Sequence, residues 1–222
     1  PVPVSHGHAV TADCPGLPMT FDHHLVIFAR AARRGAVKRR LAADIGDGPA
    51  LAFYRQTLHD VTRRLGGDPR WRTWLAVTPD TAALRSGLWP AVPGVRLIAQ
   101  GQGDLGARMA RPMAELPPGP VMIIGTDIPD ITTGHIADGF TALGNHEFVF
   151  GPAADGGYWL VGASRRPSVP AGLFRDVRWS TEHALADTLA GLPPRARTAM
   201  LGELDDVDDG AAWAAWRSRR RR

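Results

Sequence analysis

Residues 121–130 read VMIIGTDIPD, and this short stretch decides the fold class. Its first four residues are apolar without interruption, a pattern typical of a strand buried on both faces of a parallel sheet. Gly125 and Asp127 follow at once, so a carboxylate stands at the carboxyl end of the predicted strand. Ligands of open α/β sheets bind beyond the carboxyl ends of the strands, which makes Asp127 the first candidate for a functional residue.

The segments on either side of this stretch alternate between predicted strands and predicted helices. Further strands are expected at 24–29, 73–79, 95–100, 147–153, 157–162 and 198–204. Helices are expected at 50–65, 104–116, 133–143, 180–192 and 210–216. Pro112 should kink or shorten the second of them, and Ser180 or Thr181 should cap the fourth. The alternation predicts an α/β fold, a single-domain three-layer α/β/α sandwich with a mostly parallel sheet. The domain is expected to span 23–216, between an irregular extension at 1–22 and an arginine-rich tail at 217–222.

The composition is that of a globular protein, with 44% hydrophobic and 22% charged residues among 222. The sequence shows no run near the roughly 18 consecutive apolar residues of a membrane span and no signal sequence at its start. Cys14 is the only cysteine and has no partner for an internal disulfide. We therefore expect a cytoplasmic protein. Five arginines after Trp216 account for the net charge of +4, and we interpret them as a solvated, mobile end rather than a nucleic-acid or lipid contact.

Acidic turns follow three of the predicted strands. Asp127 is placed to hold a divalent cation, although an aspartate in a turn also caps helices, a role that Asp130 suits better. Asp155 lies in GPAADGGYWLVG, where Asp-Gly is a strong hairpin signal and the longer link also suits a functional acid. ELDDVDDG at 203–210 either caps a helix or contributes a carboxylate to a metal site. Three such turns together favour a shared Mg²⁺ site for a phosphate-bearing substrate.

Positive charge follows the first predicted strand, in RAARRGAVKRRL at 30–41, where six of twelve residues are basic. Gly35 can bend the backbone there, and Lys38 is the only lysine in the chain. Arginine binds phosphate oxygens as a fork and lysine acts as a point charge, so Lys38 and Arg40 are candidate phosphate contacts. A solvated basic surface is the alternative. A polar stretch, QGQGDLGARM at 100–109, offers glycine N–H groups to a base or sugar, and Asp104 is expected to cap the following helix.

The order of these motifs resembles that of a known family. F-A-R-x-x-x-x-G-x-V-K-x-R-L precedes Q-G-x-G-D-L-G-x-R-M, G-x-D-x-P, G-P-x-x-D-G-G-Y-x-L-x-G, W-S-T-E and D-V-D. Over residues 24–209 the chain resembles the arsenosugar-biosynthesis-type or radical-SAM (selenodomain)-associated glycosyltransferases. These belong to the nucleotide-diphospho-sugar transferase superfamily, which has the GT-A fold. The lysine loop is also similar to that of phospholactate guanylyltransferases and, more loosely, of molybdenum-cofactor nucleotidyltransferases.

The resemblance implies roles for particular residues. The nucleotide and its phosphates would meet Ala29, Arg30, Gly35, Lys38, Arg40, Gln100, Gly103, Asp104 and Arg108. Mg²⁺ or Mn²⁺ would bind Asp127 and Asp208, and the acceptor or sugar side would comprise Asp155, Gly156, Gly157, Tyr158, Trp179, Ser180, Thr181 and Glu182. Lys38, Arg40, Asp127 and Asp155 are expected to act in catalysis. Two departures stand out: Arg39 replaces a threonine of the family, and DVDDGAAW replaces a D-V-D-T-P ending, so that Asp206 rivals Asp208 as a ligand.

Three functions are compatible with these residues. The motif match favours metal-dependent glycosyl transfer from a nucleotide-diphospho-sugar to a small-molecule acceptor. The second function is guanylyl or cytidylyl transfer from a nucleoside triphosphate to a phosphorylated small molecule, with release of pyrophosphate. The third is a non-catalytic nucleotide-binding protein, since a fold does not fix a function.

Overall fold

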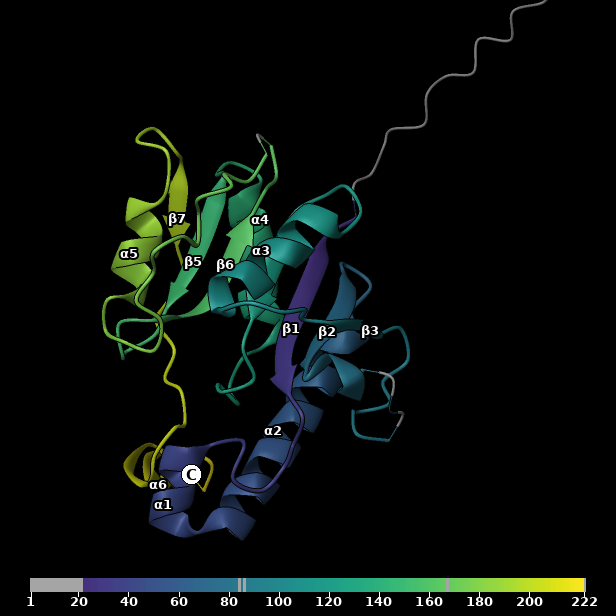
Figure 1. The fold of residues 1–222 in the computed structure, drawn as a ribbon, viewed down its shortest axis with the longest axis vertical. Coiled ribbons are helices and arrows are strands. Elements are labelled where there is room, and N and C mark those ends of the chain that lie inside the picture. Colours follow the sequence, from purple (N-terminus) through teal and green to yellow (C-terminus); the bar gives the residue numbers. More distant parts are fainter. Residues whose placement is uncertain (1–21, 84, 86, 167, 222) are drawn as a thin grey trace, which may run out of the picture.

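A seven-stranded sheet forms the centre of the protein (Figure 1). The structure is a computed structural model that describes residues 22–83, 85, 87–166 and 168–221. The strands are β1 (His24–Arg30), β2 (Arg72–Thr78), β3 (Arg96–Ala99), β4 (Val121–Ile124), β5 (Phe148–Pro152), β6 (Tyr158–Ala163) and β7 (Thr198–Met200). Their order is β3-β2-β1-β4-β6-β5-β7, and β6 runs antiparallel to both of its neighbours while the other pairs are parallel. The predicted mostly parallel sheet is confirmed.

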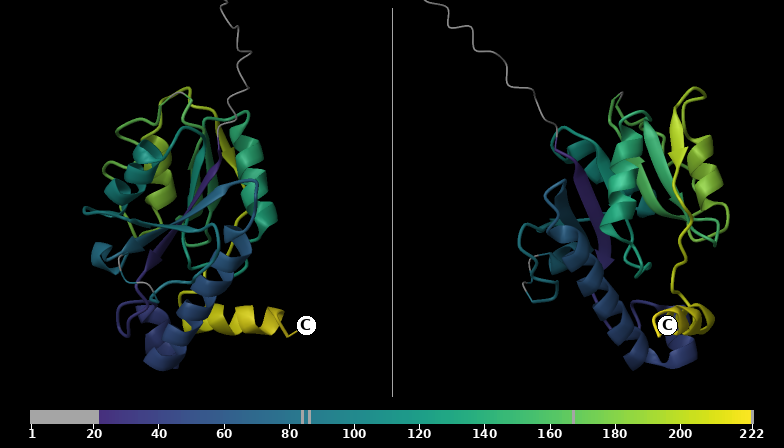
Figure 2. Two further views of the ribbon diagram at one scale, coloured as in Figure 1. Left: turned by 90° about the vertical axis from the view of Figure 1, so that its right-hand side faces the viewer. Right: turned by 180° about the vertical axis from the view of Figure 1, so that it is seen from behind.

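Helices cover both faces of the sheet (Figure 2, left). The helices are α1 (Arg39–Ile45), α2 (Asp47–Gly66), α3 (Leu105–Glu115), α4 (Thr133–Leu143), α5 (Ala184–Ala190) and α6 (Gly210–Arg219), with a short 3-10 turn η1 (Asp80–Ala82). Alternate residues of β1 point to opposite faces: Leu25 and Ile27 pack with α2 and α4, and Val26 packs with α3. Burial on both faces is the physical reason that the central strands read as unbroken apolar runs. This is the predicted three-layer sandwich.

A small third cluster lies beyond the carboxyl end of β1, where α1 and α6 pack together (Figure 1). Leu41 and Phe53 are buried there with Val207, and Trp213 and Trp216 of α6 cover them. Asp209 caps α6 by accepting the N–H of Ala212 at 2.9 Å, and Asp44 of α1 accepts the N–H of Gly210 at 2.7 Å. The chain therefore returns its C-terminal helix to the loop that follows its first strand.

Several helices differ from their predicted bounds. α3 continues through Pro112 to Glu115, because Pro112 and its neighbours Met109 and Met113 form a buried face whose packing outweighs local propensity. Helix α5 begins only at Ala184, since Ser180 has a left-handed backbone (φ 61°) that a helix excludes. Helix α1 was not predicted from the basic run.

Near the chain ends, α6 extends to Arg219 and so includes part of the predicted arginine-rich tail. The predicted N-terminal extension lies outside the described residues except for Asp22. Across the residues that the structure describes, no helix combines the length and apolar character needed to cross a membrane.

Candidate active site

A cavity of about 800 Å³ opens at the carboxyl ends of β1, β2 and β4. Most of the residues predicted to form the site line it: Ala29, Arg30, Lys38, Arg40, Gln100, Gly103, Asp104, Arg108, Asp127, Asp155, Gly157, Tyr158, Trp179, Ser180, Thr181 and Asp208. Gly35, Gly156 and Glu182 do not line it. Motifs spread over 180 positions of the sequence are thus gathered at one end of the sheet, as the α/β topology predicts.

An ammonium group joins two carboxylates at this cavity. Nζ of Lys38 lies 2.7 Å from Oδ1 of Asp127 and 2.6 Å from Oδ1 of Asp208. The lysine side chain is 2% exposed, whereas the aspartate side chains are 52% and 38% exposed. The positive charge is therefore buried, while both carboxylates remain accessible to a ligand.

Local backbone structure explains how three distant segments meet. Asp127 directly follows β4 in the Gly125–Asp127 turn, and its carbonyl accepts the N–H of Val207 at 3.1 Å. That bond places Asp208 beside Asp127 as the chain crosses from β7 to α6. Lys38 begins α1 in a left-handed conformation (φ 48°, ψ 48°), which is uncommon for a residue with a side chain and is often found at functional sites.

Negative charge exceeds positive charge around Lys38. Burial, together with repulsion by Asp208 and Asp155, raises the pKa of Asp206 to about 6. Burial alone would lower the pKa of Lys38, but the carboxylates of Asp127 and Asp208 outweigh it, so this pKa ends above its ordinary value. Three aspartates, Asp127, Asp206 and Asp208, thus share the field of a single ammonium, and their surplus negative charge favours a divalent cation.

Arginines and structural polar groups border the cavity on the side that the sequence predicts to bind the nucleotide. Arg40 is 72% exposed and reaches Asp209 at 3.4 Å, and Arg108 donates to the carbonyl of Gly103 at 2.9 Å. Asp104 caps α3 as predicted, accepting the N–H of Ala107 at 2.8 Å. Gln100 donates its amide to the carbonyls of Ala29 and Ala76, at 3.2 and 2.9 Å. The two bonds from Gln100 hold the start of the polar stretch 100–109 against β1 and β2.

Asp155 lies in a β5–β6 hairpin, as its Asp-Gly sequence suggested, and it also lines the cavity. Its Oδ1 accepts the N–H of Gly157 at 2.9 Å. Gly156 has φ +82°, and a Cβ there would lie 2.2 Å from the carbonyl oxygen of Glu182. The glycine is needed because the hairpin packs directly against the segment before α5.

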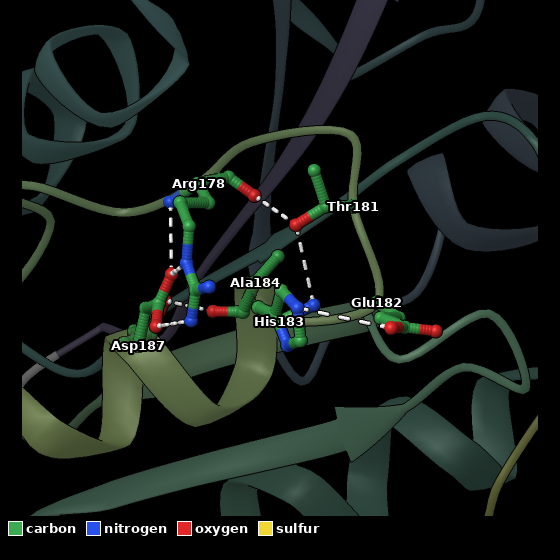
Figure 3. Close-up of polar contacts among 7 residues, drawn as sticks. Arg178, Thr181, Glu182, His183, Ala184 and Asp187 are labelled. Carbon is green, nitrogen blue, oxygen red and sulfur yellow. Dashed lines mark hydrogen bonds and ion pairs between the residues drawn. The ribbon is translucent and has the colours of Figure 1, made fainter.

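A polar network shapes this segment before α5 (Figure 3). Arg178 donates from its backbone N and Nε to Oδ2 of Asp187, at 3.0 and 2.9 Å, and from Nη2 to Oδ1 at 2.8 Å. Thr181 donates to the carbonyl of Arg178 at 2.7 Å and accepts the N–H of His183 at 3.2 Å. Trp179 lies between these anchors and forms part of the cavity wall with Tyr158.

Some roles differ from those expected. Asp130 does not cap α4; Thr132 does, by accepting the N–H of His135 at 3.3 Å, while Asp130 accepts from Nε1 of Trp216 at 3.1 Å. Sequence reasoning missed Tyr54, whose hydroxyl accepts the N–H of Arg30 and donates to its carbonyl, both at 2.8 Å. Its position in an apolar helical pattern gave no signal of a place in the cavity wall.

The donors present fit a divalent cation of the Mg²⁺ or Mn²⁺ type. Among the described residues, no group of three or more His, Cys, Asp or Glu side chains is arranged as a metal-binding cluster. Mg²⁺ commonly uses only one or two carboxylates and completes its shell with water and substrate phosphates. Asp127 and Asp208 supply that number, and the surplus negative charge around them suits a cation.

Known proteins share this fold. The family described as "Uncharacterized protein conserved in bacteria (DUF2064)" matches residues 57–181. None of the curated proteins matches the chain. A solved structure from Desulfovibrio desulfuricans G20, provisionally assigned as a nucleotide-diphospho-sugar transferase, has a TM-score of 0.74 and 25% identity, covering 86% of this chain and 84% of that one.

More distant structures show the same architecture. CMP:2-keto-3-deoxy-manno-octonic acid synthetase complexed with CTP has a TM-score of 0.55 and 12% identity, over 90% of this chain and 98% of that one. Glucosyl-3-phosphoglycerate synthase from Mycobacterium tuberculosis, in complex with Mn²⁺ and UDP, has a TM-score of 0.52 and 13% identity, over 90% of this chain and 76% of that one. The predicted GT-A-like fold is confirmed.

Proposed function

The chain belongs to the DUF2064 family, and from that premise and the geometry of the cavity we propose that it is a metal-dependent glycosyltransferase. Its donor is a nucleotide-diphospho-sugar, and its acceptor is a small molecule with a nucleophilic oxygen. The resemblance of its motifs to the arsenosugar-type glycosyltransferases supports this choice. So does the likeness to the Desulfovibrio protein, whose provisional assignment is to the same donor class.

One observation carries the proposal: two accessible carboxylates and a lysine meet at the end of β1 and β4, with arginines around them. In glycosyl transfer the bond from the sugar to the diphosphate breaks, and negative charge develops on the departing oxygen. Arg40 and Arg108, which line the cavity, would bind that diphosphate. A bound Mg²⁺ or Mn²⁺ at Asp127 and Asp208 would neutralise charge on the phosphate oxygens.

The opposite wall suits the acceptor. Asp155 has Oδ1 engaged by the N–H of Gly157, which leaves Oδ2 to take the proton of the acceptor hydroxyl as the new bond to the sugar forms. Tyr158 and Trp179 provide apolar ring surface beside it. Sugar rings pack well on such surfaces, because their C–H faces are apolar while their hydroxyl groups need polar partners.

The basic loop favours a second candidate, nucleotidyl transfer. Four of the six basic residues in 30–41 line the cavity, which is more than a diphosphate requires and would suit a triphosphate. CMP:2-keto-3-deoxy-manno-octonic acid synthetase, which has the same fold, was solved with CTP. In this reaction a phosphorylated acceptor attacks the α-phosphate and pyrophosphate leaves.

A thermal-shift panel separates the two reactions. We expect Mn²⁺ with UDP- or GDP-sugars to raise the melting temperature, since a ligand that binds only the folded state stabilises it. Nucleoside triphosphates that stabilise more than the diphosphates, with pyrophosphate released from a phosphorylated acceptor, would instead establish nucleotidyl transfer. If no nucleotide shifts the melting temperature in the presence of Mn²⁺, both enzymatic functions are wrong.

A further inference from the structure

The side chain of Lys38 lies where a cation shared by Asp127 and Asp208 would lie. Its Nζ contacts Oδ1 of both carboxylates, at 2.7 and 2.6 Å. Divalent cations of the Mg²⁺ to Ca²⁺ type bind carboxylate oxygens at about 2.0–2.6 Å. An ion that bridged the same two oxygens would overlap the ammonium group, so the two cations cannot occupy this position together.

A lysine is the basic residue best suited to take the place of a metal ion between two carboxylates. Lys38 is the only lysine in a chain whose other basic side chains are arginines. An ammonium is a compact charge that fits between two single oxygens, whereas a planar guanidinium prefers both oxygens of one carboxylate. The Arg178 pair with Asp187 shows that second mode in the same protein.

The two carboxylates need a cation between them. They come from separate segments, the turn after β4 and the chain before α6, and the bond from Val207 N–H to the Asp127 carbonyl holds these segments together. Both carboxylates also lie in the field of Asp206, which increases the repulsion. Without an intervening positive charge, like charges at this separation would drive the segments apart.

We propose that Lys38 is a resident counterion that exchanges with the divalent cation: its ammonium leaves Asp127 and Asp208 when the metal enters and then binds the phosphates of the nucleotide. This inference rests on the proposed function and describes how its site is regulated. The metal alone must displace a buried ion pair and binds weakly. The metal and the nucleotide bind together tightly, because the released ammonium gains phosphate partners.

The structure gives Lys38 the means to move. It lines the cavity at the start of the short helix α1, where its backbone has a left-handed conformation. Its four-carbon stem has several rotatable bonds, so the ammonium can change partners without movement of the sheet. Arg40 reaches Asp209 rather than either carboxylate, so it takes no part in the exchange.

Because the chain has one lysine, amine labelling reports on this residue. We expect sulfo-NHS-acetate to acetylate Lys38 slowly in the wild-type protein without metal, as measured by mass spectrometry of the peptide that contains it. Saturating Mg²⁺ alone should accelerate the reaction several-fold, and Mg²⁺ with UDP or GDP should slow it again. Protein denatured in urea gives the reference rate for a free lysine.

Metal affinity provides the second measurement. Lys38→Met removes the competing charge and keeps much of the stem, so Mn²⁺ affinity without nucleotide, measured by electron paramagnetic resonance, should rise about tenfold. The matched control is Arg40→Met, which removes a nearby charge that touches neither carboxylate and should change this affinity little. UDP or GDP should strengthen Mn²⁺ binding much more in the wild type than in Lys38→Met, because reciprocal coupling depends on the released ammonium.

The outcomes separate this inference from the proposed function. Equal Mn²⁺ affinity in the wild type and Lys38→Met, or an unchanged labelling rate when Mg²⁺ is bound, overturns the exchange and leaves the transferase intact. Mn²⁺ that binds neither protein, with or without nucleotide, overturns the exchange and the metal site together. If Lys38→Met does not fold, Lys38→Gln replaces it, and the labelling experiment needs no variant.

Discussion

Two ion-paired segments border the same cavity and differ in their charge balance. Lys38 lies between Asp127 and Asp208, so one cation faces two carboxylates, and its side chain is 2% exposed. Arg178 pairs with one carboxylate, that of Asp187, and is 59% exposed, and three N–H groups of the arginine bond to both carboxylate oxygens (Figure 3). The second pair is neutral and saturated. The first carries surplus negative charge and accessible oxygens, which is the property of a site that binds another cation.

Both segments also contain backbone that is costly to form. Lys38, Asp176 and Ser180 all have positive φ without being glycine, at 48°, 59° and 61°. Each such residue costs about 1–2 kcal/mol and persists only where surrounding contacts fix it. In the first segment those contacts are the carboxylates that a ligand would use. In the second they include the Arg178–Asp187 pair, which lies beside Trp179 of the cavity wall.

Asp127→Asn tests the first segment, in which Lys38 faces Asp127 and Asp208, and should have the largest effect. It removes one charge from the proposed metal site, so kcat/KM or Mn²⁺-dependent nucleotide affinity should fall about 100-fold. The control is Asp130→Asn, three residues along the same turn, with the same 52% exposure but partners in α6. Asp130→Asn should retain nucleotide binding. Equal losses in the two variants would show that the turn matters only for structure.

Gly156→Ala tests how closely the Asp155 hairpin must approach the segment of Arg178. The new Cβ would lie 2.2 Å from the carbonyl oxygen of Glu182, at a φ of +82°. We expect a loss of about 3 kcal/mol in the free energy of unfolding, measured by urea denaturation. Gly87 has a similar φ of +88° but open space around it. Gly87→Ala therefore measures the cost of the left-handed backbone by itself, which we expect to be about 1 kcal/mol. Similar losses at both positions would mean that the close contact is unimportant.

The fold was predictable because its signals are local. Unbroken apolar runs such as 121–124 identify central strands, and their alternation with helices fixes the sandwich. The positions of Asp127 and Asp104 followed from the same logic, since both stand directly after a strand or before a helix. The helix bounds failed where tertiary contacts overrode local preference, as at Pro112 in α3 and Ser180 before α5.

The partners of the candidate residues were not predictable. Lys38 was expected to contact phosphate, and nothing in GAVKRRL indicates that its ammonium turns toward Asp208, 170 residues away. That contact depends on the path of the chain between β7 and α6 and on the bond between Val207 and Asp127. Tyr54 was missed for the same reason, because its hydroxyl bonds to the backbone of Arg30, 24 residues earlier.

Arg178→Met tests the second segment, in which Arg178 pairs with Asp187. Loss of the pair should loosen Trp179 and raise the KM for the acceptor about fivefold at most, since an exposed ion pair contributes little, while kcat changes less. The chain offers a close control in Arg70, which donates from Nε and Nη2 to the carboxylate of Asp68 at 2.9 and 2.6 Å. The Arg70 side chain is 52% exposed and does not line the cavity. Arg70→Met should leave KM unchanged. A fall in kcat without a change in KM would instead place Arg178 in the chemistry.

The smallest expected effect is the pH dependence of the folding stability that the Arg178–Asp187 pair contributes. Hydrogen bonds from Arg178 lower the pKa of Asp187 below its ordinary value of 3.8. Above about pH 5 the carboxylate is ionised in both the folded and the unfolded chain, so the pair contributes its full stability. As the pH falls below about 4, the unfolded chain takes up the proton first, and this contribution is lost.

Urea denaturation of the wild type and Asp187→Asn between about pH 3 and pH 8 measures this contribution as the difference in unfolding free energy. The difference should be constant above about pH 5 and shrink toward pH 3. Asp68→Asn should behave in the same way, because Arg70 lowers the pKa of Asp68 by the same kind of bond. A difference that grows as the pH falls would show that Asp187 is destabilised by its surroundings, and the contrast between the two segments would then be lost.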